Sequence, residues 1–315
     1  MALFGTHDLP RPSVRIIEVS PRDGLQHESA FVPTTRKIAL INALSRTGVS
    51  EIEAGSFVSP TAIPQLADSD EVFRSIERIP GVTYSALVPN ERGLERARAA
   101  AVKKIALFTA ASDSFTRHNI KSTVRDSLNR FAPIIRAAER DGILVRAYIS
   151  TVVFCPYEGR VTPRRVLDVM QQLFDLGVSE LSLGETVGKA APSDLRRLLD
   201  TVIAHINPAR LSLHCHDTYG LGIANVLTAW EDYGITAFDC SAGGLGGCPS
   251  APGASGNVAT EDVVFALKAS GAIVPVNELL VATCARQFAE LLQHPLNSRL
   301  SQLPHPCESS AALKV

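Results

Sequence analysis

The chain has 315 residues, of which 45% are hydrophobic and 20% are charged, so it can bury a large core. The 31 Lys and Arg residues against 32 Asp and Glu residues leave a net charge of −1, which argues against binding to the phosphate backbone of nucleic acids. No stretch approaches the length of apolar sequence that crosses a bilayer, so we expect no membrane span.

The cysteines and the N-terminus indicate a reducing compartment. Six cysteines are scattered over the chain without a Cys-x-x-Cys pair, a pattern that favours neither a zinc ribbon nor a disulfide scaffold. The first ten residues lack a basic stretch followed by an apolar run, so they do not resemble a secretory signal. We therefore expect a cytoplasmic protein.

Short runs rich in β-branched residues alternate along the chain with segments of helical periodicity. We predict strands at Val14–Val19, Ser50–Ala54, Thr83–Val88, Lys104–Phe108, Leu144–Ser150, Glu180–Leu183, Arg210–His214 and Ala237–Cys240. The predicted helices lie near residues 34–47, 69–78, 91–101, 122–141, 163–176, 193–206, 221–233 and 260–270. Thr162 before Pro163 is typical of a helix start, and Gly48, Gly177 and Gly234 are typical of helix ends.

Strict alternation of strands and helices implies a parallel sheet, and eight units in about 255 residues match the size of a (β/α)8 TIM barrel. The alternative is an open doubly wound sheet. That fold would favour a phosphate-binding glycine motif after the first strand, where this chain has Ser20-Pro-Arg-Asp-Gly24 instead. We therefore predict a TIM-barrel catalytic domain over residues 1–275. Residues 276–315 are expected to add a C-terminal helix and a poorly ordered tail to the same structural unit.

Functional groups of a TIM barrel lie at the C-terminal ends of its strands. Arg22 and Asp23 follow the first predicted strand, where a simple loop ion pair is as plausible as a functional pair. Glu51 and Glu53 share one side of the second strand. A carboxylate inside the barrel needs a partner, so we expect Glu53 to meet Arg22 or a water held by a metal.

The seventh predicted strand ends in His214-Cys-His-Asp217. Side chains at positions i and i+2 of a strand share a face, so both imidazoles can reach one ion. A lone His-x-His pair is a weak signal, but its place at the C-terminal end of a barrel strand strengthens it.

After the last predicted strand, six glycines lie within residues 243–256. A loop of this composition can open and close over a site, and it would carry Cys248 into the site on closure. The alternative for Cys248 is a small buried thiol. Asn257 ends the loop.

The strand ends together offer Asp23, His214, His216 and Asn257 as ligands of a divalent metal. Two imidazoles and two oxygen donors without a thiolate suit Mg²⁺ or Mn²⁺ better than structural zinc. Such a metal can act as a Lewis acid, and the adjacent Arg22 could stabilise an enolate oxygen.

Several motifs in order resemble those of the hydroxymethylglutaryl-CoA lyase family, over about residues 14–295. They are Val19-Ser-Pro-Arg-Asp-Gly-Leu-Gln26, Glu53 with Ser56-Phe-Val-Ser-Pro60, Cys155-Pro-Tyr-Glu-Gly159, His214-Cys-His-Asp-Thr-Tyr-Gly220 and Gly243-Gly-Leu-Gly-Gly-Cys-Pro249. The resemblance implies cleavage of 3-hydroxy-3-methylglutaryl-CoA to acetyl-CoA and acetoacetate by a metal-dependent barrel.

The resemblance also implies roles for individual residues. Asp23, His214, His216 and Asn257 match metal ligands, and Arg22 matches the residue that stabilises the enolate of acetyl-CoA. Cys248 matches a catalytic thiol, and Glu53 an acidic residue of the active site. Gln26, Tyr148 and Ser182 match substrate-binding positions. Asp23 or a histidine such as His214 could act as the base. An acyl-CoA partner and a homodimer or higher homo-oligomer are implied in the same way.

One position departs from the family, which often has Gly-Asp-Thr where this chain has Gly184-Glu-Thr186. Glu185 matches a catalytic position but extends its carboxylate by one methylene, roughly 1.5 Å of bond length. The closest alternative is therefore a lyase for a related 3-hydroxy-3-carboxyalkyl-CoA such as citramalyl-CoA. A condensing synthase of the same barrel group and a non-catalytic CoA-binding barrel are further alternatives.

Overall fold

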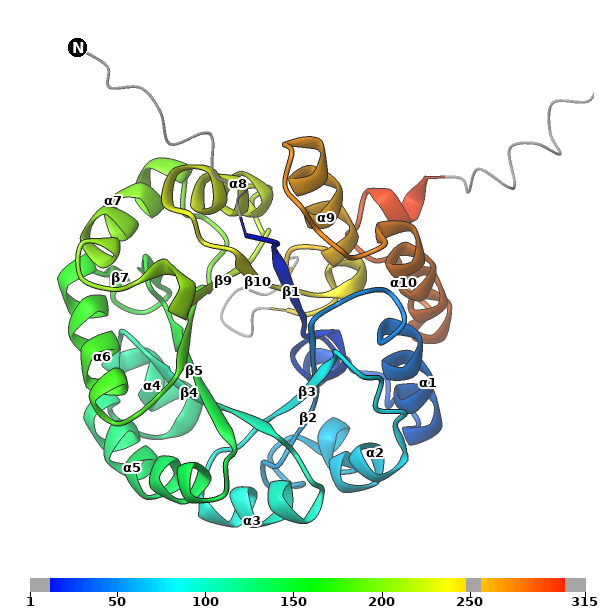
Figure 1. The fold of residues 1–315 in the computed structure, drawn as a ribbon, viewed down its shortest axis with the longest axis horizontal. Coiled ribbons are helices and arrows are strands. Elements are labelled where there is room, and N and C mark those ends of the chain that lie inside the picture. The colour runs from blue at the N-terminus through cyan, green and yellow to red at the C-terminus, as the bar shows by residue number, and fades with distance from the viewer. Residues whose placement is uncertain (1–11, 248–255, 304–315) are drawn as a thin grey trace, which may run out of the picture.

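The computed structural model describes residues 12–247 and 256–303. Eight parallel strands close into a barrel in the order β1-β10-β9-β8-β5-β4-β3-β2, which confirms the predicted TIM barrel and excludes the open sheet (Figure 1). The bounds of its strands are β1 Arg15–Glu18, β2 Glu51–Ser56, β3 Thr83–Leu87, β4 Lys104–Ala110, β5 Leu144–Ser150, β8 Glu180–Glu185, β9 Leu211–Cys215 and β10 Ala237–Cys240.

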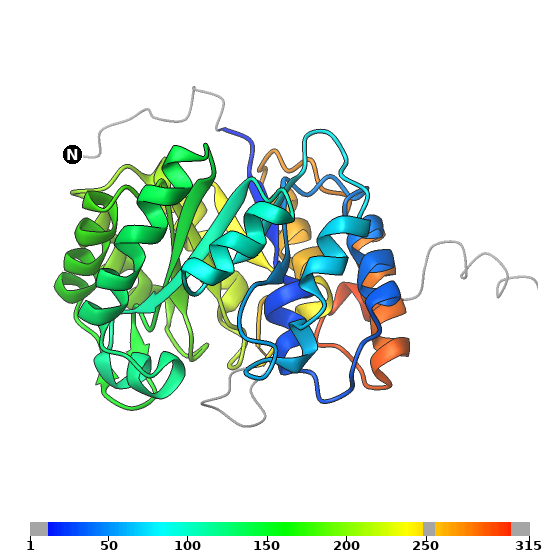
Figure 2. The same cartoon turned by 90° about the horizontal axis from the view of Figure 1, so that it is seen from below.

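Helices cover the outside of the barrel, as the two perpendicular views show (Figures 1 and 2). Their bounds are α1 Thr34–Leu44, α2 Ser69–Ser75, α3 Glu91–Ala99, α4 Asp113–Ile120, α5 Val124–Arg140, α6 Pro163–Asp175, α7 Pro192–Ile203, α8 Gly222–Tyr233, α9 Thr260–Ala269 and α10 Glu278–Leu292. The helix start predicted at Thr162 is confirmed, because its side chain accepts a hydrogen bond from the N–H of Arg165.

Two elements were not expected from the sequence. One is helix α4, which Ser112 caps by accepting the N–H of Phe115 at 3.1 Å. The other is a two-stranded hairpin of β6 (Phe154–Cys155) and β7 (Gly159–Arg160). They follow β4 and β5 respectively, so both enlarge the C-terminal end of the barrel.

Residues alternate between the two sides of each strand, which separates an apolar layer from a polar interior. On β9, Leu211 and Leu213 belong to the main hydrophobic core against the helices. Ser212 contacts Arg146 of β5 and His214 contacts Asp239 of β10, so these two side chains lie inside the barrel.

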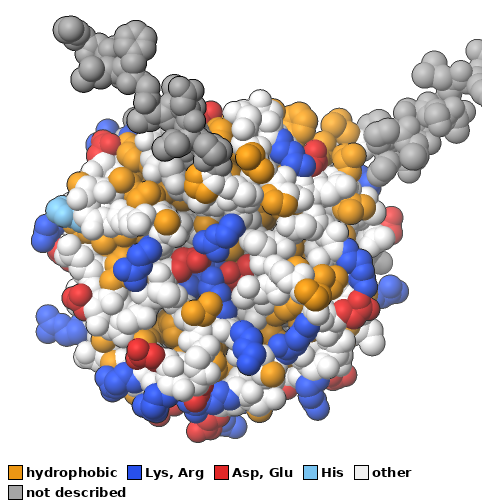
Figure 3. Space-filling model, in the orientation of Figure 1, with side chains coloured by type: hydrophobic (Ala, Val, Ile, Leu, Met, Phe, Trp, Pro, Cys, Tyr) orange, Lys and Arg blue, Asp and Glu red, His pale blue; other side chains and the backbone are white. Residues whose placement is uncertain are grey.

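The interior of the barrel contains a set of paired charges that we call the interior ion network. Lys104 donates to Glu51 at 2.7 Å, and the Arg146 guanidinium lies 2.8 Å from an Asp239 oxygen. Figure 3 shows acidic and basic side chains together at the centre of one face of the molecule. The network consists of Arg15, Glu51, Lys104, Arg146, Glu180 and Asp239.

The C-terminal helix α10 packs on α1 and α9. Its buried residues, Phe288 among them, belong to the same hydrophobic cluster as the barrel, in keeping with a single structural unit. The domain boundary at residue 275 stays a prediction, and the tail expected to be poorly ordered begins at Leu303 and otherwise lies outside the described residues. Among the described helices, none has the length and apolar character needed to cross a bilayer.

Candidate active site

A tight helical turn, η1 (Ser20–Gly24), follows β1 directly and carries Arg22 and Asp23. The Val19 carbonyl accepts the N–H groups of both residues, at 3.2 and 2.8 Å, and that of Gly24 at 3.2 Å. A Cβ atom on Gly24 would lie 3.1 Å from the side chain of Leu245, so the turn packs closely against the loop after β10. Adjacent side chains of opposite charge are thereby fixed at the C-terminal end of the barrel.

Arg22 is buried between two carboxylates. Its Nε and Nη2 atoms lie 2.6 and 2.5 Å from Glu53 Oε2, and its Nη1 atom lies 2.6 Å from Asp23 Oδ1. Burial lowers the pKa of Arg22, but the charges of Glu53 and Asp23 outweigh it and raise the pKa above its ordinary value. The expected pairing of Glu53 with Arg22 is therefore present, and so is the Arg22–Asp23 ion pair.

Glu53 also accepts a hydrogen bond from the Tyr148 hydroxyl at 3.0 Å. Burial raises the pKa of Glu53, an effect that the guanidinium groups of Arg22 and Arg146 oppose. Both arginines lie near the face of the Tyr148 ring, with Cζ 5.3 and 4.9 Å from its centroid. The Tyr148 ring in turn meets His214 edge-on at 5.9 Å between centroids. The side chain of Tyr148 thus contacts Arg22, Glu53 and His214.

The ligand atoms of Asp23, His214 and His216 all lie within 4.8 Å of one another, close enough to hold one metal ion. His214 Nε2 is 3.8 Å from Asp23 Oδ2, and the two imidazole rings are 5.4 Å apart. Burial lowers the pKa of His214, but the carboxylates of Asp239 and Asp23 outweigh it and raise the pKa. Three of the four predicted ligands therefore converge.

Asn257, the fourth predicted ligand, lies beside the cluster. It pairs with His216 across an antiparallel bridge, and its Nδ2 donates to Asp23 Oδ2 at 3.0 Å. Its side-chain oxygen is buried, and no hydrogen-bond donor reaches it from the described residues. A hard cation would satisfy that oxygen, because Mg²⁺ and Mn²⁺ prefer oxygen ligands, so the residues fit a divalent metal.

The remaining predicted site residues differ in where they lie. Gln26 lies at the site, where its Nε2 donates to Asp23 Oδ1 at 2.9 Å. Ser182 is fully buried inside the barrel and donates to Asp239 at 2.6 Å. Cys248 lies outside the described residues.

Glu185 is separate from the cluster. It lies on the side of β8 that also carries Leu181 and Leu183, which pack in the core against the helices. Among the residues that the structure describes, no donor lies within hydrogen-bond distance of its buried carboxylate. Burial raises its pKa to about 7, although the nearby backbone N–H groups of Gly188, Ala190 and Lys189 act to lower it. Its backbone carbonyl accepts the N–H of His216 at 3.2 Å. Its catalytic role stays a prediction.

A cavity of about 790 Å³ opens beside the cluster. Arg22, Asp23 and Gln26 form part of its wall, and it extends over the C-terminal ends of β2, β3 and β4 toward α4 and α5. Its lining mixes apolar and polar side chains, including Val58, Leu87, Phe108, Asn119 and Arg130. The cavity is large enough for a sizeable organic ligand, and Arg22 and Asp23 form part of its wall.

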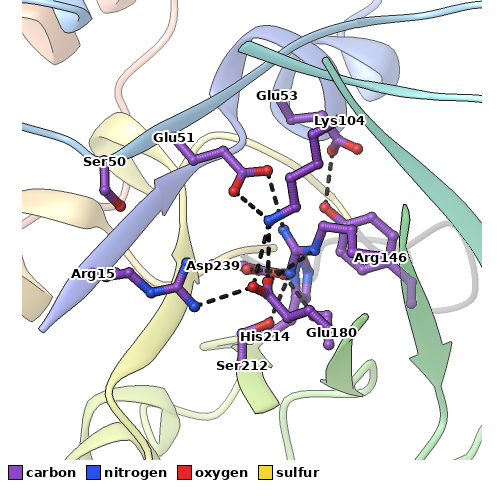
Figure 4. A network of polar contacts seen from close by, with 12 residues as sticks. Arg15, Ser50, Glu51, Glu53, Lys104, Arg146, Glu180, Ser212, His214 and Asp239 are labelled. Carbon is purple, nitrogen blue, oxygen red and sulfur yellow. Dashed lines mark hydrogen bonds and ion pairs between the residues drawn. The ribbon is translucent and has the colours of Figure 1, made fainter. Parts of the chain in front are cut away.

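Sequence reasoning did not identify Asp239 and Arg146 as neighbours of the site. Asp239 Oδ2 lies 3.4 Å from His214 Nδ1, and Arg146 forms an ion pair with Asp239 (Figure 4). The signal was present as charged or polar residues at alternate positions of several strands, such as Arg146 and Tyr148 or Glu180 and Ser182. Polar residues at alternate positions usually indicate a strand face exposed to solvent. Only the closure of the strands into a barrel places these side chains in the interior.

The fold is a TIM barrel, and two histidines, a carboxylate and an arginine lie together at the C-terminal ends of its strands. These features are typical of barrels with a site for a divalent metal. The profile of the HMGL-like family matches residues 13–288. The chain belongs to this family.

Individual relatives agree over nearly the whole chain. A mitochondrial hydroxymethylglutaryl-CoA lyase of Bos taurus is 45% identical over 289 residues, which cover 92% of this chain and 89% of that protein. The crystal structure of the HMG-CoA lyase of Bacillus subtilis has a TM-score of 0.91 at 44% identity, covering 93% of this chain and 99% of that one. An HMG-CoA lyase from Acinetobacter baumannii, in complex with coenzyme A and 3-methylmalate, has a TM-score of 0.88 at 39% identity, covering 93% and 96%.

Proposed function

We propose that the protein is a lyase that cleaves 3-hydroxy-3-methylglutaryl-CoA to acetyl-CoA and acetoacetate with a divalent metal. The observation that carries the proposal is the joining of Arg22 to the cluster of Asp23, His214 and His216 at one end of a large cavity. The lyases of Bos taurus and Bacillus subtilis, at 45% and 44% identity, support this choice of substrate.

Asp23, His214, His216 and Asn257 would hold the metal, and we propose Mg²⁺ or Mn²⁺. The buried side-chain oxygen of Asn257, which meets no donor within residues 12–247 and 256–303, supports a hard cation at this position. When bound, the cation would supply Lewis acidity toward the hydroxyl and carboxylate oxygens of the substrate.

The cleavage is a retro-Claisen reaction. A base removes the proton of the tertiary hydroxyl, the C2–C3 bond breaks, and its electron pair passes to the thioester as an enolate. A proton then returns to C2, which yields acetyl-CoA, while the other fragment leaves as acetoacetate. His214 and Asp23 are the candidate bases. Cys248, from its place in the glycine-rich segment, is our candidate for returning the proton.

Arg22 is suited to stabilising the enolate. A cation held in place beforehand costs no reorganisation when negative charge develops on the thioester oxygen. The contacts with Glu53 and Asp23 fix the guanidinium in that way, and Arg22 forms part of the cavity wall. The Tyr148 hydroxyl in turn donates a hydrogen bond to Glu53.

The cavity supports an acyl-CoA ligand. The wall at Arg22 and Gln26 suits the polar reacting acyl group, and the apolar side chains of Val58, Leu87 and Phe108 suit the thin pantetheine arm. The Acinetobacter baumannii relative was solved with coenzyme A, in keeping with this assignment.

Incubating the metal-loaded protein with a panel of acyl-CoA thioesters tests the proposal. We expect acetyl-CoA and acetoacetate in equal amounts from 3-hydroxy-3-methylglutaryl-CoA, and none after chelation of the metal. Faster acetyl-CoA release from citramalyl-CoA would move the assignment to the related lyase. Release from no thioester would favour a synthase or a CoA-binding barrel.

We further propose a cytoplasmic homodimer or higher homo-oligomer. The four cysteines among the described residues (Cys155, Cys215, Cys240 and Cys284) are free and buried, which suits a reducing compartment. A related lyase of Mus musculus is named cytoplasmic and that of Bos taurus mitochondrial. Light scattering of the purified protein tests the assembly, and cell fractionation tests the compartment.

A further inference from the structure

The inner nitrogen of His214 faces a buried carboxylate. Asp239 lies in register with His214 on the neighbouring strand, and its Oδ2 atom is 3.4 Å from His214 Nδ1 (Figure 4). The contact is longer than the common N–H···O distance of about 2.9 Å. The opposite nitrogen, Nε2, faces Asp23 at 3.8 Å. The two ring nitrogens of His214 thus face opposite sides, one the interior ion network and one the metal cluster.

Asp239 is held firmly in this place. Arg146 Nη2 donates to its two oxygens at 2.8 and 3.0 Å, and the Ser182 hydroxyl donates to Oδ2 at 2.6 Å. The guanidinium of Arg146 thus pairs with the carboxylate of Asp239 as its counter-ion. The carboxylate is therefore an acceptor with a fixed position beside His214.

A neutral imidazole carries one proton on one of its two nitrogens. With the proton on Nδ1, His214 donates to Asp239 and its Nε2 lone pair faces the metal cluster. With the proton on Nε2, the Nδ1 lone pair would face a carboxylate oxygen, and no lone pair would be left for a metal. The fixed negative charge selects the first arrangement.

We propose that Asp239 is a positioning residue that holds the Nδ1 proton of His214 and so directs the Nε2 lone pair toward the metal, with Arg146 and Ser182 fixing its carboxylate. The inference rests on the proposed metal-dependent function and adds a residue that the sequence motifs do not contain. It also gives Ser182 a role in supporting the site from inside the barrel.

Replacing Asp239 by Asn tests the proposal in two ways. First, ¹⁵N NMR of the imidazoles at alkaline pH, with His214 assigned from a His214→Gln variant, reports the tautomer without metal or substrate. We expect the Nδ1–H form in the wild type and the Nε2–H form in Asp239→Asn. Second, titration with Mn²⁺ should show roughly 10–100-fold weaker binding, the range found when a group orienting a metal ligand is removed.

Two controls separate positioning from a general loss of structure. Asp262→Asn replaces another buried carboxylate, one that accepts the backbone N–H groups of Arg299 and Leu300, and should leave both readouts unchanged. The double variant Asp239→Asn with Arg146→Met restores the charge balance of the interior. It should still bind Mn²⁺ weakly, because the carboxylate is still missing.

An Nε2–H tautomer in the wild type would overturn the proposal. So would wild-type Mn²⁺ affinity in Asp239→Asn or its full recovery in the double variant. A wild-type protein that binds Mn²⁺ with the Nδ1–H tautomer but cleaves none of the acyl-CoA thioesters would refute the proposed lyase function and leave this inference standing.

Discussion

Replacing Arg22 by Met removes the cation that the proposed mechanism uses to stabilise the enolate. Loss of one donor of this kind costs about 10²–10³-fold in kcat, equivalent to about 2.7–4 kcal/mol. Because Arg22 takes three short contacts to Glu53 and Asp23, its place is well defined, and we expect the upper part of that range. The four proposed metal ligands remain, so Mn²⁺ affinity should change far less than kcat.

The same substitution affects stability. Removing one partner of a buried ion pair typically costs about 3–5 kcal/mol. Here the loss in the free energy of unfolding should lie at the lower end of that range. Glu53 still accepts the hydrogen bond of the Tyr148 hydroxyl at 3.0 Å. Because burial already raises the pKa of Glu53, its carboxylate can also take up a proton. Adding Glu53→Gln to Arg22→Met should therefore recover stability without recovering kcat.

The assays are steady-state release of acetyl-CoA at saturating Mn²⁺ and substrate, Mn²⁺ titration, and urea unfolding. Arg78→Met is the matched control, since Arg78 donates only to backbone carbonyls of Phe73, Ala100 and Ala101 among its hydrogen bonds in the described chain. It should lower stability and leave kcat unchanged. A loss in kcat below tenfold for Arg22→Met, or a kcat restored by Glu53→Gln, would refute the reasoning.

Three further outcomes follow from the structure. Burial raises the pKa of Glu261 to about 7 from an ordinary value of 4.5, so its contribution to stability is complete below about pH 4.5 and is lost as the pH rises through about 7. A glutamine at this position does not titrate, so the free energy of unfolding of Glu261→Gln, measured by urea unfolding, should rise relative to that of the wild type by up to about 3 kcal/mol between acid and mildly alkaline pH. A difference between the two proteins that stays constant with pH would contradict this. The hydroxyl of Thr123 caps α5 by accepting the N–H of Asp126 at 3.1 Å. Thr123→Ala should therefore lower the free energy of unfolding by about 1 kcal/mol, and no measurable loss would show that the cap is dispensable. Mn²⁺ at 100 times its Kd should raise the free energy of unfolding by about 2.7 kcal/mol, and a His216→Ala variant that gained as much would place the metal elsewhere.

The barrel could be predicted because most of its strands are short runs rich in β-branched residues that alternate with segments of helical periodicity. The predicted bounds of Leu144–Ser150 and Ala237–Cys240 are those found. Helix α4 (Asp113–Ile120) was missed because it is short and mixes polar with apolar residues, so its periodicity is weak, although Ser112 is a good cap. Likewise the hairpin of β6 and β7 is too short to show alternation.

Asp23, His214 and His216 could be predicted because each lies at or just beyond the end of a strand, where the fold brings distant segments together. Asn257 could be predicted because it ends the glycine-rich segment that follows β10. The contact between Asp239 and His214 could not be, because it depends on the register of two strands and on which side each faces. Ser182 shows the same limit. The family resemblance implies a substrate-binding role, which stays a prediction, but nothing in the sequence pointed to the hydrogen bond of its hydroxyl to Asp239 at 2.6 Å.

The six residues of the interior ion network carry three positive and three negative charges, since Arg15, Lys104 and Arg146 face Glu51, Glu180 and Asp239. Replacing one charged residue there leaves its partner buried without a counter-ion, whereas replacing both partners together keeps the net charge of the network at zero. Evolution can therefore alter this part of the barrel only in coupled steps. We expect related sequences to exchange these positions in pairs, so that substitutions on different strands are correlated where no motif links them.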